Sequence, residues 1–186
     1  MKSLALSTLA LTLWASPAVA LFGMLQGGYY DNDDDDNNDN CKSITEVICD
    51  NPNSTDVLCD ILLLAGIDDD LETDTYTVFA PTNEAFDDIP DEVVDLIMGD
   101  PSNDENRELQ NILGLHVHPG VALKDTDLKC DGKILMANEE YTVTICEGDR
   151  MYQMGPGNLV TDYPEIVVKN IEACNGIVHV ISEVIL

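Results

Sequence analysis

Hydrophobic and polar positions repeat with two different periods along the chain, and the change between them separates helices from strands. In most of residues 43–113, apolar side chains recur three or four positions apart, which predicts amphipathic helices. From Leu115 onwards, apolar and polar residues alternate, which predicts strands. Helices thus come mainly first and strands later, and this order favours an α+β fold over repeated βαβ units.

The predicted helices carry recognisable start and stop residues. Ser43 and Glu46 have the spacing of a capping box. Gly66 suits the end of a second helix, and Pro90 suits the first turn of a third. The apolar faces of the four predicted helices are, in order, Ile44, Val47 and Ile48; Val57, Leu58, Ile61, Leu62 and Ala65; Val93, Val94, Leu96 and Ile97; and Leu109, Ile112 and Leu113.

Residues 76–86 predict a strand followed by a sharp corner. The first four positions are β-branched or aromatic, as in a buried strand. Pro81 ends that strand because it cannot donate to a ladder, and Thr82 can cap the next element, with Asn83 in its first turn. Residues 177–185 near the far end are equally apolar, so we expect these two strands to pair within one sheet.

Three further strands are predicted in the second half of the chain. Residues 133–137 and 141–146 form a hairpin, and residues 166–171 form a separate strand. Asn175-Gly176 is a strong tight-turn signal that leads into the last strand. In the second arm of the hairpin, Tyr141, Val143 and Ile145 alternate with Thr142, Thr144 and Cys146.

Three stretches resemble the signature motifs of the fasciclin domain. TVFAPTNEAF at residues 77–86 and NGIVHVISEVIL at residues 175–186 are similar to the first and last motifs. LGLHVHPG at residues 113–120 is similar to the tyrosine–histidine motif, which is usually close to YHVVPG. The resemblance covers roughly residues 42–186. It implies an α+β fold, a compact β-sheet wedge with several N-terminal and peripheral helices.

Acidic residues outnumber basic ones strongly, which excludes one class of partner. The chain has 36 Asp and Glu against 8 Lys and Arg, for a formal net charge of −28. Such a charge repels phosphate backbones, so we expect no nucleic-acid partner. It attracts cations and basic surfaces loosely. With 45% hydrophobic residues the chain is long and apolar enough for one domain with a sizeable core.

The first residues predict secretion. Residues 1–20 have the pattern of a signal peptide, with Lys2 before an apolar run and a small-x-small cleavage site at Ala18 and Ala20. No later stretch is expected to span a membrane. We predict a disordered Asp/Asn-rich segment at residues 21–41, followed by the domain at residues 42–186.

The Asp-rich run does not fit an EF-hand calcium loop. Counting from Asp31, position six is Asp36 where the loop needs glycine, and position twelve is Lys42 where it needs glutamate. Two interpretations stay open: a solvated solubility tail, or weak and diffuse calcium binding. The candidate ligands for the second are Asp31, Asp33, Asp34, Asp35 and Asp36.

Six cysteines in a secreted chain predict three disulfides, for which the sequence alone allows fifteen pairings. Cys49 and Cys59 flank a turn, and Cys130 and Cys146 bracket the hairpin-like segment, which would leave Cys41 with Cys174. A zinc site is the weaker alternative, because no CxxC spacing occurs. Asn53 begins an N-glycosylation sequon, so a glycoprotein is expected.

Three histidines are the only candidates for chemistry. His116 and His118 could offer two imidazoles from one face of a strand, and His179 could complete a hydrolase-like metal site. In the fasciclin resemblance, His116 and His179 correspond to hydrogen-bonded structural histidines instead. If His116 and His118 share a face and one of them is buried, we expect the other to be buried too. No GxSxG elbow or phosphate loop occurs, so we expect no enzyme and no cofactor.

The fasciclin resemblance implies a secreted, non-enzymatic cell-adhesion or extracellular-matrix protein that recognises a protein or a polysaccharide. Leu115 replaces the tyrosine that the family implicates in receptor binding, so that mode of binding is not expected. Self-association would supply avidity to a single domain. The alternative is an acidic calcium- or mineral-interacting matrix component. The adhesion-motif candidates are Thr82, Asn83, Leu115, His116, Pro119, Asn175 and His179.

Overall fold

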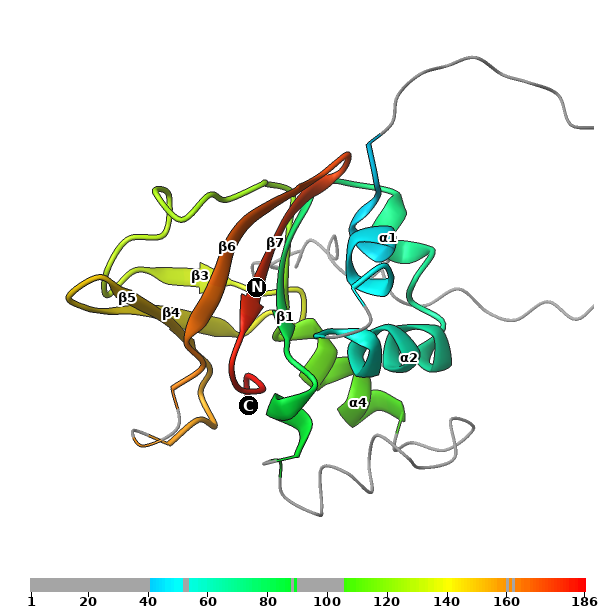
Figure 1. Ribbon diagram of the computed structural model, residues 1–186. Coiled ribbons are helices and arrows are strands. Elements are labelled where there is room, and N and C mark those ends of the chain that lie inside the picture. The colour runs from blue at the N-terminus through cyan, green and yellow to red at the C-terminus, as the bar shows by residue number, and fades with distance from the viewer. Residues whose placement is uncertain (1–40, 52–53, 88, 90–105, 160, 162) are drawn as a thin grey trace, which may run out of the picture. The chain divides into compact units, whose positions relative to one another are not determined.

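A computed structural model describes residues 41–51, 54–87, 89, 106–159, 161 and 163–186. The Asp-rich run, Asn53 and the helix predicted from Pro90 lie outside these residues. The described elements confirm the predicted α+β order (Figure 1). They are α1 (Ile44–Cys49), α2 (Asp56–Ala65), η1 (Asp70–Glu72), β1 (Tyr76–Pro81), η2 (Glu84–Phe86), α4 (Asn106–Gly114), β2 (Val117–Pro119), β3 (Lys133–Leu135), β4 (Tyr141–Glu147), β5 (Arg150–Met154), β6 (Ile166–Ala173) and β7 (Gly176–Ile181).

Four strands form the central sheet, sheet A, in the order β2-β1-β7-β6. Strands β1 and β7 lie side by side and parallel, from Tyr76 opposite Gly176 to Pro81 opposite Ile181, which confirms the predicted pairing. Their neighbours on either side are antiparallel. Gly176 has φ 155°, and a Cβ there would overlap the carbonyl oxygen of Tyr76. The tight turn therefore requires glycine.

The helices cover one face of sheet A (Figure 1). The capping box at Ser43 and Glu46 is present, and Gly66 ends α2 in the left-handed conformation, as predicted. The helices and the sheet face share one apolar cluster. Its buried members are Ile44, Ile48, Leu58, Ile61, Leu62, Ile67, Leu71, Val78, Ala80, Leu109, Leu113, Val117 and Val178.

Three strands form a second sheet, sheet B, in the order β3-β4-β5, and all its pairs are antiparallel. Sheet B lies on the side of sheet A opposite to the helices (Figure 1). A second apolar cluster joins the two sheets. It contains Phe79, Leu115, Leu128, Ile134, Met136, Ile166, Ile181 and Ile185.

In sheet B, strands β4 and β5 place polar residues on the buried side, next to the apolar Ile134 of β3. Thr142 and Thr144 on β4 and Gln153 on β5 are fully buried. The Gln153 amide donates to the Thr142 hydroxyl at 2.6 Å, and the Thr144 hydroxyl donates to the Gln153 carbonyl at 2.8 Å. Tyr141, by contrast, is 54% exposed. The alternation found in the sequence locates the strand, but its threonine face points inward.

Three disulfides join Cys49 to Cys59, Cys130 to Cys146, and Cys41 to Cys174, which are the predicted pairs. No free thiol remains among the six cysteines, all of which lie in described positions, so they supply no zinc ligands. The disulfides stabilise the domain mainly by restricting its unfolded chain. Within the described residues, no helix has the length and apolarity that crossing a membrane demands.

Candidate functional site

The polar side chains in the corner after β1 form hydrogen bonds to backbone groups of the domain. Thr82 accepts a hydrogen bond from the Ala85 amide through its hydroxyl at 3.3 Å, although the N-cap of the short 3₁₀-helix η2 is Asn83, which makes no side-chain cap bond there. Asn83 accepts from the Val57 amide at 3.2 Å. Thr55, at the N-cap of α2, makes no side-chain cap bond. Asn83 therefore caps α2 from a distant part of the chain.

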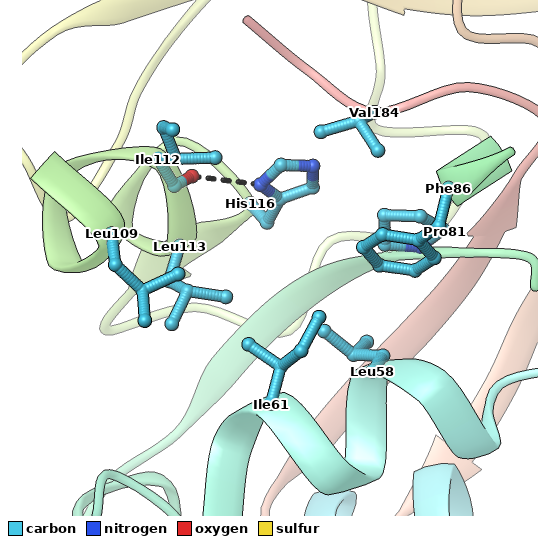
Figure 2. A pocket seen from close by; sticks show the side chains of 9 residues that line it. All are labelled: Leu58, Ile61, Pro81, Phe86, Leu109, Ile112, Leu113, His116 and Val184. Carbon is cyan, nitrogen blue, oxygen red and sulfur yellow. Dashed lines mark hydrogen bonds between the residues drawn. The ribbon is translucent and has the colours of Figure 1, made fainter. Parts of the chain in front are cut away.

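His116 ties the end of α4 to the end of the chain. Its Nδ1 lies 2.8 Å from the Ile112 carbonyl, and its Nε2 accepts from the Ile185 amide at 3.0 Å. Nε2 must be the acceptor, so the proton is on Nδ1 and donates to Ile112 (Figure 2). Burial lowers the pKa of His116 to about 4. The imidazole is therefore neutral at neutral pH.

His179 plays a similar role in the middle of β7. Its Nε2 donates to the Leu123 carbonyl at 2.9 Å, and its Nδ1 accepts from the Asn170 amide at 3.3 Å. The ring stacks on Phe79 with 5.5 Å between centroids. Burial lowers the pKa of His179 as well. Both motif histidines thus form hydrogen bonds to backbone groups through both ring nitrogens.

The three histidines do not assemble a metal site. His118 is half-exposed on β2, and its Nδ1 lies 2.7 Å from the Leu135 carbonyl at the edge of sheet B. His116 is buried and His118 is not. His116 precedes β2 and faces the last turn of α4, so the condition that both lie on one face of a strand is not met. Among the described residues, no group of three His, Cys, Asp or Glu is placed to hold a metal ion.

The other motif candidates are also structural or lie at the surface. Leu115 is buried in the cluster between the two sheets. Asn175 accepts from the Ile44 amide at 2.9 Å and donates to the Leu71 carbonyl, which fastens the β6–β7 turn to the helices. Pro119 is the exposed member of the set, at the end of β2.

One small hollow opens beside His116, between α2, α4 and the corner (Figure 2). Its free volume of about 10 Å³ is near the lower limit for a single water molecule. A substrate-sized ligand does not fit. The lining is apolar apart from the histidine and consists of Leu58, Ile61, Pro81, Phe86, Leu109, Ile112, Leu113, His116 and Val184.

One surface feature does not follow from the sequence pattern. Leu135 and Tyr141 are opposite one another on β3 and β4 and are 44% and 54% exposed. The alternation in β4 was the available signal, but it does not say which side of the strand faces water. The residue that decides this, Gln153, lies on the next strand.

Comparisons with known proteins agree with the motifs. The family model described as "Fasciclin domain" matches residues 53–186. The chain is 31% identical over 124 residues to the pig (Sus scrofa) transforming growth factor-beta-induced protein ig-h3, covering 66% of this chain and 16% of that protein. It is 32% identical over 113 residues to mouse (Mus musculus) stabilin-1, covering 60% of this chain and 4% of that protein.

A bacterial relative is closer in length. Protein sll1483 of Synechocystis is 25% identical over 148 residues, covering 80% of this chain and 75% of that protein. A solved FAS1 domain pair from the insect cell adhesion molecule fasciclin I is 18% identical, with a TM-score of 0.44, over 76% of this chain and 43% of that one.

The chain spans only a small part of its pig and mouse relatives, which are much longer proteins. What it shares with them is the domain itself. The family model covers well over half of the chain, and it includes all three motifs whose residues hold the two sheets and the helices together. The chain therefore belongs to the fasciclin domain family.

Proposed function

We propose that this chain is a secreted, non-enzymatic adhesion or extracellular-matrix protein that acts by surface recognition of another protein or a polysaccharide. The family's motifs support this role, because the resemblance implies attachment without catalysis. The proposed organisation is a signal peptide at residues 1–20, an acidic segment at 21–41 and the domain at 42–186.

The observation that carries the proposal is the use of the motif histidines. His116 and His179 each hydrogen-bond backbone groups through both ring nitrogens. Both are buried, and burial lowers the pKa of each. A catalytic histidine needs a nitrogen that can reach a substrate. These side chains build the domain instead, and recognition falls to exposed parts of the surface.

The proposed test is capture from the producing cell's own extracellular matrix. The mature protein is used as bait in calcium and in a chelator, with and without residues 21–40. Capture of a defined partner by the shortened protein, regardless of calcium, is the expected result. Capture that needs both calcium and the acidic segment would overturn the domain-based proposal. It would favour the acidic calcium- or mineral-interacting component, with Asp31 to Asp36 as ligands.

Two further features belong to this proposal. The replacement of the motif tyrosine by Leu115, which is buried, argues for a binding mode other than the receptor binding that the family attributes to that tyrosine. Glycosylation of Asn53 would fit a secreted protein, and a mass shift on treatment with a glycosidase would detect it.

A further inference from the structure

The outward side of sheet B is an apolar surface. The register places Leu135 opposite Tyr141, Val143 opposite Met154, and Ile145 opposite Tyr152, so all six share one side. Leu135 and Tyr141 are 44% and 54% exposed, three of the others are half-buried, and Tyr152, which lies against Tyr163, is buried. We call the set Leu135, Tyr141, Val143, Ile145 and Met154 the outer face of sheet B.

The core does not require this apolar surface. The inward side of the sheet already carries Thr142, Thr144 and Gln153, whose polar groups bond one another. No buried side-chain nitrogen or oxygen of the described residues lacks a partner. Threonines on the outer face would therefore support the same strand pairing and the same propensity for strand. Contiguous apolar side chains on an exposed sheet face are typical of an interaction surface.

The ends of this surface carry exposed carboxylates. Glu139 and Glu140 lie in the β3–β4 turn, next to Tyr141, and Glu147 and Asp149 lie at the β4–β5 turn. Arg150 at that end approaches Glu165 within 3.7 Å, which offsets its charge. Lys133 lies 6.0 Å over the ring of Tyr141 and is the cation within the surface. An apolar centre is thus framed by negative charge at both ends.

We propose that the outer face of sheet B is a docking surface for a cationic protein segment whose basic side chains alternate with apolar ones. This inference rests on the proposed function and names the surface and the class of partner. Apolar side chains would cover Leu135, Tyr141 and Val143, while lysine or arginine would meet the carboxylates at the two turns. The net charge of −28 steers a cationic partner toward the protein. A second copy is disfavoured, because it would bring the same carboxylates.

The test uses a synthetic peptide of alternating lysine and valine, titrated into the full secreted protein by calorimetry. Two comparison peptides separate the contributions: lysine with serine keeps the charge, and glutamate with valine keeps the apolar side chains. We expect the lysine–valine peptide to bind about tenfold or more tightly than either. Equal binding of the lysine–serine peptide would overturn the proposal, because charge alone would then explain the affinity.

Paired variants locate the binding surface. Leu135→Ser with Tyr141→Ser should weaken the lysine–valine peptide about tenfold or more. Leu63→Ser with Leu64→Ser on α2 removes side chains that are 54% and 66% exposed and should leave binding unchanged. Equal loss in both variants overturns the proposal. A second result would also overturn it. If the wild-type protein does not bind the peptide but self-associates with rising concentration, and only the sheet B variant abolishes this self-association, then the occupant is a second copy.

Matrix capture separates this proposal from the proposed function. If the wild-type protein captures a matrix partner and the sheet B variant captures it equally, the docking surface is wrong and the adhesion function stands. If the wild-type protein captures nothing while the peptide still binds the outer face selectively, the adhesion function is wrong and the docking surface stands. Loss of both peptide and matrix partner in the sheet B variant alone supports both.

Discussion

Sheet A and sheet B differ in the kinds of side chain that they bury. In sheet A, the six residues of β7 and five of the six of β1 are buried, and apolar side chains pack on both faces. In sheet B, the buried side combines Ile134 with two threonines and a glutamine, while a tyrosine and a leucine face water. Cys130–Cys146 joins the loop before β3 to the end of β4.

The difference separates stability from recognition. Sheet A contains the family motifs, and its two central strands, β1 and β7, are enclosed by helices on one side and sheet B on the other, so almost all of their residues are buried. Sheet B is held by Ile134 in the apolar cluster between the sheets, by hydrogen bonds on its inward side and by a disulfide. The apolar side chains on its outer face are therefore available to a partner. Substitutions in each sheet test this division.

Phe79→Ala in β1 should give the largest loss. Phe79 is fully buried, joins both sheets and stacks on His179. Removing its ring should lower the free energy of unfolding by about 3–5 kcal/mol, measured by chemical denaturation. Leu64→Ala on α2, which is 66% exposed, serves as the control and should change it by less than about 0.5 kcal/mol. Similar losses in the two variants would mean that the buried residues of sheet A contribute no more to the free energy of unfolding than exposed residues on a helix.

Acid should weaken sheet A through His116. Its pKa is about 4 in the folded protein against 6.5 ordinarily, so the unfolded chain binds the extra proton first. The contribution is complete above pH 6.5 and is lost as the pH falls toward 4. The free energy of unfolding that is lost between these two pH values through His116 should be about 3 kcal/mol.

The matched variant for this titration is His116→Gln. The carboxylates and His179 titrate in both proteins, so their effects cancel in the difference between the two unfolding free energies. We expect the advantage of the wild-type protein to shrink between pH 6.5 and pH 4, where the His116 proton is taken up. A difference that stays constant over this range would show that His116 titrates normally.

Gln153→Ala should destabilise sheet B by about 1–3 kcal/mol, because it leaves the buried hydroxyls of Thr142 and Thr144 without their partner. Replacing all three, as Thr142→Val, Thr144→Val and Gln153→Met, should be nearly neutral, since no buried polar group then remains unpaired. Thermal and chemical denaturation of the two variants check this. A triple variant as unstable as Gln153→Ala would mean that packing, and not hydrogen bonding, orders this sheet.

The helices that cover sheet A and the turn before β7 could be predicted well because their signals in the sequence are local. The Ser43–Glu46 capping box, the terminating Gly66 and the Asn175-Gly176 turn each depend on neighbouring residues, and all three are present. The pairing of β1 with β7 followed from two strands apolar enough to be central. Their parallel direction did not, because it depends on the whole chain between them.

Sheet B shows where prediction from sequence ends. The hairpin and its disulfide follow from spacing, but the inward side of β4 depends on Gln153, which supplies both a donor and an acceptor from the next strand. The acceptor role of His116 likewise depends on Ile185, at the far end of the chain. Contacts of this kind are decided by tertiary packing and leave no periodic trace in the sequence.

Tyr141→Thr on the outer face of sheet B should have the smallest effect on stability. Threonine keeps the preference for strand, and the change removes only a half-exposed ring and its contact with Lys133. The free energy of unfolding should fall by less than about 1 kcal/mol in chemical denaturation. Phe79, of similar size, differs in being enclosed. A loss above about 2 kcal/mol would mean that the protein itself covers Tyr141, and the outer face would then belong to the core and not to a partner.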